Sequence, residues 1–294
     1  MEIGLVLPQT GPTASPALLR DFALVAEESG IDRLWAVDHI VLPYRTTSKY
    51  VLGRRPTVVA DGWLSDNLAP NYEMLTTLTW VAGLTSSIGL GTSVASLPLR
   101  NPVLNARQLA TLDACSGGRL VCGVGIGWLR EEATAMGLPW DRRADRCEEH
   151  IAVLRTLWCS QSSYVEFHGE FVNFDPMDPR PQPNQQPIPI LIGGHSATAL
   201  SRAVRIGDGW ISAPMPTARL AELLDQIRRL ADSNGRDHAT ILKVASTSPR
   251  TLDELGRAIP EYYRLGVDHL QVVLPPLDRN TVLARVRQIA EMKT

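Results

Sequence analysis

The chain has 294 residues, 44% of them hydrophobic and 20% charged, and its formal net charge is −2. This length and composition allow a large buried core, so we expect a single domain over residues 1–294. Lysine and arginine form no long run, which argues against nucleic acid and membrane surfaces as partners and leaves small molecules. Pro8 and Gly11 interrupt the apolar N-terminus too early for a signal sequence, so we expect a cytoplasmic protein.

Disulfide bonds and metal sites are not indicated. The four cysteines have no CxxC spacing, which favours reduced structural thiols. No HxH pair follows the first predicted strand, and this argues against a metal-dependent barrel hydrolase. We therefore predict no metal centre.

Apolar runs typical of buried strands alternate with amphipathic helical stretches along the whole chain. Eight strands are predicted, each followed by a helix, and this alternation favours an α/β fold, a closed (β/α)8 TIM barrel, over a doubly wound open sheet. The predicted strands span residues 3–7, 33–37, 88–93, 120–124, 188–192, 210–212, 241–245 and 269–274. The predicted helices span residues 16–29, 73–85, 103–114, 142–158, 197–206, 218–233, 252–265 and 280–292.

Two long segments interrupt this alternation. Residues 39–72 follow the second strand and are rich in basic, aromatic and proline residues, so we predict a lid or substrate-binding loop over the barrel mouth. Residues 161–187 precede the fifth strand, and the alternation around Gly169 predicts a β-hairpin. An ordinary surface insertion is the alternative for both.

Asp38 and His39 end the second predicted strand and are the best candidates for proton chemistry. The carboxyl ends of barrel strands meet at one mouth, where a carboxylate and an imidazole can accept, donate or orient a proton near neutral pH. Glu73 and Glu131 are weaker candidates, because glutamates in the first turn of a helix more often stabilise its dipole.

Gly193, Gly194, His195 and Ser196 follow the fifth strand and begin a helix. The backbone N–H groups and the helix dipole would attract an anion here, with Ser196 as the N-cap, so we predict a phosphate site. His195 either contacts the ligand or lines the turn.

Three glycines alternate in the run GVGIG, at positions 123, 125 and 127. On a strand they would lie on one face and let a flat ring or another backbone approach closely, although simple helix packing is an alternative. The spacing is not the dinucleotide-binding fingerprint GxGxxG.

Four motifs in order carry a resemblance to a known family. They are GLGTSVASLPLRNP (89–102), LDACSGGRLVCGVGIGWLREE (112–132), PIPILIGG (187–194) and RIGDGWI (205–211). Over nearly its whole length the chain resembles the bacterial luciferase-like superfamily, the luciferase-like monooxygenase family of flavin and deazaflavin oxidoreductases. WAVDHIVLP (35–43) and the 116–128 block are most similar to the actinobacterial branch that depends on coenzyme F420.

The resemblance implies an F420-dependent oxidoreductase that transfers a hydride between the cofactor and a small organic substrate. It implies a cis peptide bond between Ser93 and Val94 that supports the ring, and an Asp38–His39 pair at the reaction centre. The similar sugar-phosphate dehydrogenases have a glutamate where this chain has Trp128, which argues against sugar oxidation. The implied cofactor contacts are Asp38, Ser93, Val94, Gly125, Gly127, Gly193, Gly194, His195 and Ser196.

Two alternatives within the same resemblance stay open. An FMNH2-dependent two-component monooxygenase would bind FMN and need a flavin reductase as its partner. A non-catalytic flavin-binding barrel would bind the cofactor without turnover. The resemblance also implies a possible homodimer.

Overall fold

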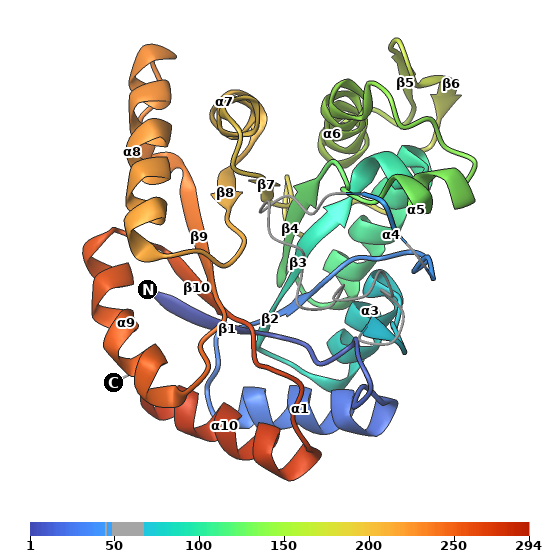
Figure 1. Ribbon diagram of the computed structural model, residues 1–294. Coiled ribbons are helices and arrows are strands. Elements are labelled where there is room, and N and C mark those ends of the chain that lie inside the picture. The colour runs from blue at the N-terminus through green and yellow to red at the C-terminus, as the bar shows by residue number, and fades with distance from the viewer. Residues whose placement is uncertain (45, 49–67, 294) are drawn as a thin grey trace.

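The computed structural model describes residues 1–44, 46–48 and 68–293. Eight parallel strands form a closed barrel in the order β1-β10-β9-β8-β7-β4-β3-β2, and helices surround it (Figure 1), which confirms the predicted fold. The barrel strands are β1 (Glu2–Val6), β2 (Arg33–Ala36), β3 (Gly89–Ser96), β4 (Leu120–Gly125), β7 (Ile190–Gly193), β8 (Gly209–Ile211), β9 (Leu242–Thr247) and β10 (His269–Val272). The helices are α1 (Pro16–Glu28), α3 (Met74–Leu84), α4 (Pro102–Cys115), α5 (Arg130–Ala135), α6 (Arg143–Cys159), α7 (Ala197–Ile206), α8 (Thr217–Ser233), α9 (Leu252–Arg264) and α10 (Arg279–Glu291).

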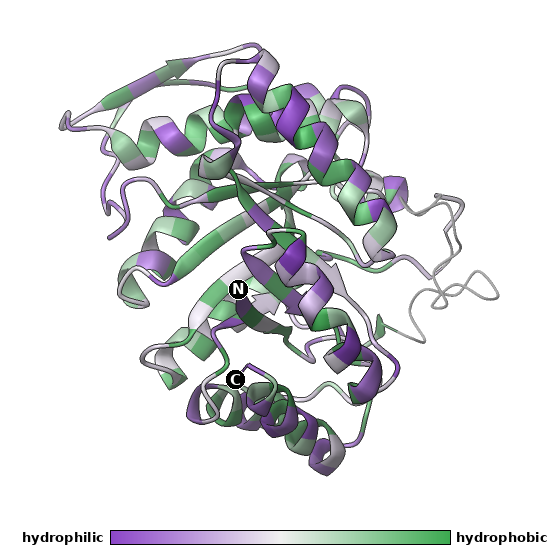
Figure 2. Cartoon of the chain, turned by 90° about the vertical axis from the view of Figure 1, so that its left-hand side faces the viewer, coloured by the Kyte–Doolittle hydropathy of each residue, from purple (hydrophilic) through white to green (hydrophobic). Residues whose placement is uncertain are grey.

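Apolar side chains of the strands fill the interior of the barrel. Trp35 on β2 is fully buried there among apolar residues of the neighbouring strands. Gly4 and Gly91 leave room for it, because a Cβ on either residue would lie within 2.5 Å of the indole ring. A second and larger core lies between the strands and the helices. Figure 2 shows mixed hydrophilic and hydrophobic residues along the helices, as expected for amphipathic elements that cover a barrel.

The predicted hairpin is present as β5 (Val165–His168) and β6 (Asn173–Met177), which pair antiparallel. It extends beyond α6 at the outer edge of the molecule (Figure 1). The carboxylate of Glu149 on α6 accepts hydrogen bonds from three consecutive backbone N–H groups of the hairpin turn, at 2.6–2.9 Å. These bonds and the packing on α6 give the hairpin a structural role.

Polar residues begin most of the helices, and Ser15, Asn101, Ser196, Thr251 and Asp278 each accept a backbone N–H bond as N-cap. Cys122 and Cys147 are buried free thiols, and burial raises the pKa of each to about 12. Within the described residues, no helix is both long and apolar enough to cross a membrane. The predicted lid is described only at its two ends, since residues 45 and 49–67 lie outside the described residues.

Candidate active site

The predicted site residues converge at the carboxyl end of the barrel. Because the eight strands are parallel, the segments that follow β2, β3, β4 and β7 all emerge at the same mouth. Asp38 and His39 follow β2, Ser93 and Val94 lie in the second half of β3, and Gly125 and Gly193 end β4 and β7. The sequence therefore places all of its candidates at one end, and their individual contacts decide what each can do.

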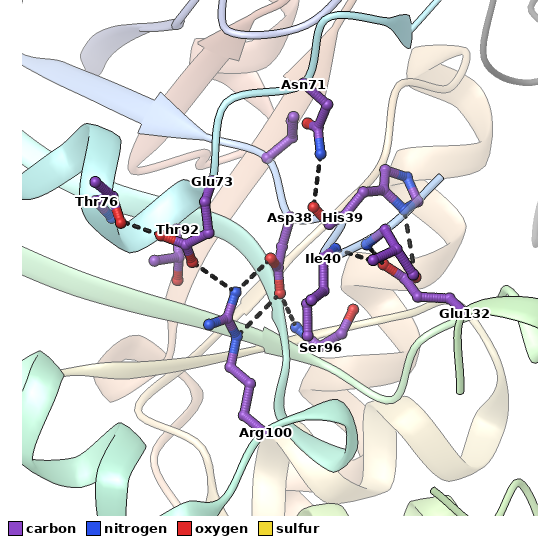
Figure 3. Close-up of polar contacts among 12 residues, drawn as sticks. Asp38, His39, Ile40, Asn71, Glu73, Thr76, Thr92, Ser96, Arg100 and Glu132 are labelled. Atoms are coloured by element: carbon purple, nitrogen blue, oxygen red, sulfur yellow. Dashed lines mark hydrogen bonds and ion pairs between the residues drawn. The ribbon is translucent and has the colours of Figure 1, made fainter. Parts of the chain in front are cut away.

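His39 is held in place by a buried carboxylate that the sequence did not single out. Its Nδ1 lies 3.4 Å from Oε2 of Glu132, and the two side chains are 15% and 2% exposed (Figure 3). The other oxygen of Glu132 accepts the backbone N–H groups of Ile40 and Val41. Trp128 lies edge-on to the imidazole, with 5.9 Å between ring centroids. The imidazole is thus fixed on two sides at the mouth.

Asp38 has a different environment from its neighbour. Its side chain is fully buried, and its carboxylate forms an ion pair with Arg100 at 2.6 Å and accepts the backbone N–H of Ser96 at 2.8 Å. Glu73 also pairs with Arg100, at 3.0 Å (Figure 3). Both oxygens of Asp38 are therefore engaged, which corrects the expectation of a carboxylate available for proton transfer. Through its contacts with Ser96 and Arg100, Asp38 instead connects the segment after β2 to the end of β3 and the residues that follow it.

Ser93 and Val94 form an irregularity at the upper end of β3. The peptide bond between them is cis, in agreement with the geometry that the resemblance implies, and the pairing of β3 with β4 shifts register here. The Ser93 hydroxyl donates a hydrogen bond to Oε1 of Gln271 across the barrel, at 3.0 Å. Val94 is partly exposed at the mouth and packs on the inner apolar cluster.

Glycines that end β4 and β7 make room for the side chain of Val94. A Cβ on Gly125 would lie 2.7 Å from Cγ2 of Val94, and a Cβ on Gly193 would lie 3.2 Å from its Cγ1. The missing side chains thus make room for Val94, which stays partly exposed. The three glycines do not share one strand face, because β4 ends at Gly125 and Gly127 lies beyond it with a φ of +74°. Its left-handed backbone turns the chain toward α5.

His195 lines the turn after β7. Its Nε2 accepts the backbone N–H of Ala213 at 3.1 Å, so the neutral ring carries its proton on Nδ1. Burial, with a smaller contribution from Arg219, lowers the pKa of His195 and favours that neutral form. Gly194 has a φ of +121°, and Ser196 caps α7 through the N–H of Ala199. The predicted turn and N-cap are present, and the ring has one donor left for a ligand.

Glu73 and Glu131 have structural partners. Glu73 caps α3 through the N–H of Thr76 and binds Arg100. Glu131 accepts bonds from Thr47 and Ser48, at 2.7 Å each for Thr47 N–H and the Ser48 hydroxyl. Although burial raises it, these hydrogen bonds lower the pKa of Glu131 to about 2. Glu131 therefore stays ionised and anchors the start of the 39–72 loop.

A comparison with protein families identifies the group to which this site belongs. The model of the luciferase-like monooxygenase family matches residues 1–267. The chain belongs to the luciferase-like monooxygenase family. The predicted family is thereby confirmed, and with it the prediction that the chain is an oxidoreductase.

Relatives within the luciferase-like family use two kinds of cofactor. The F420-dependent glucose-6-phosphate dehydrogenase of Kineococcus radiotolerans is 33% identical over 232 residues, which cover 77% of this chain and 62% of that protein. The FMNH2-dependent dimethylsulfone monooxygenase of Pseudomonas putida is 37% identical over 164 residues, which cover 54% of this chain and 44% of that protein. A solved structure of an F420-dependent secondary alcohol dehydrogenase in complex with an F420-acetone adduct superposes with a TM-score of 0.79, over 100% of this chain and 99% of that one. At 16% identity, that structure supports the fold.

Proposed function

We propose that this luciferase-like protein binds coenzyme F420 at the barrel mouth and transfers a hydride between it and a small organic substrate. The observation that carries the proposal is the ion pair of His39 with the buried Glu132, at the same end of the barrel as the partly exposed Val94. When bound, the deazaflavin supplies the carbon that accepts or donates the hydride. The protein has to orient both reactants, exclude water and move the proton.

The residues at the mouth fit a flat ring. Val94 rests on Gly125 and Gly193 and presents apolar surface toward the mouth, which suits one face of a tricyclic ring. Ser93 places a hydroxyl beside Val94, and its O–H is directed at Gln271, so its lone pairs are free to accept a hydrogen bond from a ring N–H. This combination of an apolar platform and one polar edge is typical of small-molecule cofactor sites.

The turn after β7 fits the cofactor phosphate. Gly194, Ser196 and the N-terminus of α7 supply backbone N–H groups and a favourable helix dipole. His195 is neutral and keeps Nδ1–H as a donor, because Ala213 occupies its other nitrogen. A neutral donor can bind a phosphate oxygen without a protonation step.

His39 is the residue we assign to proton transfer. Oxidation of an alcohol releases a hydride to the cofactor and a proton to a base, and the reverse reaction returns both. Because the Glu132 carboxylate accepts a hydrogen bond from Nδ1–H, the His39 Nε2 is the nitrogen that can accept the substrate proton. Trp128 replaces the glutamate of the sugar-phosphate dehydrogenases, but Glu132 brings a carboxylate to His39 from four residues further along.

Parallel titrations with oxidised F420 and oxidised FMN, followed by quenching of their own fluorescence, test the proposal. We expect selective binding of F420. Preference for FMN would favour the FMNH2-dependent monooxygenase, which the Pseudomonas putida relative represents, and oxygen uptake with an added flavin reductase would then be the next assay. Binding of neither would refute the site.

A further inference from the structure

Polar side chains converge inside the barrel at the place where Ser93 reaches across it. The hydroxyl of Ser93 donates to Oε1 of Gln271 on β10 at 3.0 Å, and the hydroxyl of Ser246 on β9 donates to the same oxygen. Gln271 is 1% exposed and Ser246 is 3% exposed. The backbone N–H of Ser246 donates to the hydroxyl of Ser212, just after β8, at 3.0 Å. We call Ser93, Ser246 and Gln271 the glutamine cluster.

The amide nitrogen of Gln271 is the unsatisfied member of the glutamine cluster. Its Nε2 is buried and has no hydrogen-bond partner in the part of the chain that the structure describes. The two serine hydroxyls fix the orientation of the amide, because an NH2 group cannot accept a hydrogen bond from either of them. A buried donor without a partner is unfavourable. The free N–H group therefore indicates an acceptor that is not part of the described chain.

The nearby indole of Trp35 cannot supply that acceptor. Gln271 pairs in register with Gly4 of β1, and a Cβ on Gly4 would lie 2.5 Å from Nε1 of Trp35. The indole nitrogen is donor-only, and among the described residues it is also buried without a partner. Two unsatisfied donors thus lie in the same part of the barrel interior.

The glutamine cluster lies next to the proposed ring site. Ser93 directly precedes Val94 and is partly exposed at the mouth. Because Oε1 of Gln271 lies 3.0 Å from the Ser93 hydroxyl, Nε2 of the same amide lies within about 5 Å of that hydroxyl. The lone pairs of Ser93 and the N–H of Gln271 are therefore an acceptor and a donor close enough to bind neighbouring atoms of one ligand.

We propose that Gln271 and Ser93 bind the polar edge of the cofactor ring, on which an N–H group lies between two carbonyl oxygens. Nε2 of Gln271 donates to one ring carbonyl, Oγ of Ser93 accepts from the N–H beside it, and Ser246 holds the amide in the required orientation. The assignment rests on the proposed function, which places the ring on Val94. Deazaflavin and flavin share this edge, so the glutamine cluster orients the ring without distinguishing F420 from FMN.

Two substitutions of Gln271 test this assignment in fluorescence titrations with F420. Gln271→Met has a similar length and no N–H donor, and we expect it to weaken binding about tenfold, because a ring carbonyl loses its partner. Gln271→Glu keeps an acceptor for both serine hydroxyls and replaces only the NH2 group by an oxygen. It should match the wild type only at pH values low enough to protonate its carboxyl, which can then donate.

Infrared difference spectra of the bound ring separate a direct contact from a structural effect. A hydrogen bond lowers the stretching frequency of a carbonyl group, so at saturating F420 the ring carbonyl band should lie at lower frequency in the wild type than in Gln271→Met. Gln182→Met is the matched control, because Gln182 donates to the carbonyl of Leu157 near the C-terminal end of α6. It should leave the affinity and the band unchanged. The melting temperature of each variant shows whether it folds.

The possible failures are distinguishable. Equal affinity and an equal carbonyl band for the wild type and Gln271→Met would overturn the assignment and would show that Nε2 binds a buried water instead. The wild type would still bind F420 in that case, and the proposed function would stand. Binding of FMN and not F420 by the wild type would refute the proposed function, and the same variants titrated with FMN would then decide the role of Gln271. Binding of neither cofactor would refute both.

Discussion

Replacement of Glu132 by glutamine should reverse the proton arrangement of His39. In the wild type the carboxylate of Glu132 acts as an acceptor, so the His39 Nδ1 donates to it and Nε2 is left without a proton. One oxygen of Glu132 is already bound by the N–H groups of Ile40 and Val41. In Glu132→Gln the single amide oxygen keeps these bonds, and the amide NH2 turns toward Nδ1. Nδ1 then has to accept, and the proton moves to Nε2.

The magnitudes follow from the contacts that the substitution alters. Glutamine has the shape of glutamate and keeps the bonds to the N–H groups of Ile40 and Val41. The free energy of unfolding should therefore fall by about 1–2 kcal/mol, which is the difference between a charged and a neutral hydrogen-bond acceptor. The effect on turnover should be larger, because a protonated Nε2 cannot accept the substrate proton. Loss of a general base lowers turnover about 100-fold or more.

Nitrogen-15 NMR of histidine-labelled protein reports the proton position directly. The chain has six histidines, and His39→Asn identifies the signal of His39. We expect an Nδ1–H tautomer in the wild type and an Nε2–H tautomer in Glu132→Gln. Glu131→Gln is the matched control: Glu131 binds Thr47 and Ser48 and not His39, so this substitution should leave the tautomer unchanged. An unchanged tautomer in Glu132→Gln would refute the orienting role of Glu132.

Other consequences concern acid stability, the buried ion pair and the ring platform. Burial lowers the pKa of three histidines, so the unfolded chain binds more protons in acid and stability should decrease as the pH falls below about 6.5. These are His150, His195 and His269. A urea midpoint that is no lower at pH 5.5 than at pH 7.5 would contradict this. Asp38→Asn should lower the free energy of unfolding by about 3 kcal/mol, because Arg100 loses its buried partner; a change below about 1 kcal/mol by urea denaturation would show that the pair is not needed. Gly125→Ala should displace Val94 and weaken F420 binding at least tenfold. The control Gly83→Ala, on the exposed face of α3 with open space around it, should not change binding. Equal F420 affinities of the wild type and Gly125→Ala in a fluorescence titration would show that the ring does not rest on Val94.

The barrel and its mouth could be predicted because they depend on local patterns. Apolar strands and amphipathic helices alternate with regular spacing, and parallel strands bring their carboxyl ends together whatever the side chains are. The N-cap role of Ser196 is equally local, since it depends on the three residues that follow. The shared strand face considered for the three glycines is absent, because alternation of glycines does not show where a strand ends and β4 ends at Gly125.

The partners of the site residues could not be predicted in the same way. Glu132 lies 93 positions from His39, and Arg100 lies 62 positions from Asp38. Both contacts depend on how the loops after three different strands fold over the mouth. The sequence drew attention to Glu131, but the rotation of α5 places Glu131 toward Thr47 and its neighbour toward His39. Adjacent residues on a helix point in directions about 100° apart, so a shift of one position decides which carboxylate enters the site.

The location of the bound cofactor is the central claim, and a crystal structure of the protein grown with F420 tests it most directly. We predict that the deazaflavin ring lies on Val94 at the carboxyl end of the barrel, with His39 beside its reactive carbon and the phosphate at the start of α7. A ring bound elsewhere, or a mouth without cofactor at concentrations that saturate the fluorescence titration, would contradict the proposed site and the function built on it.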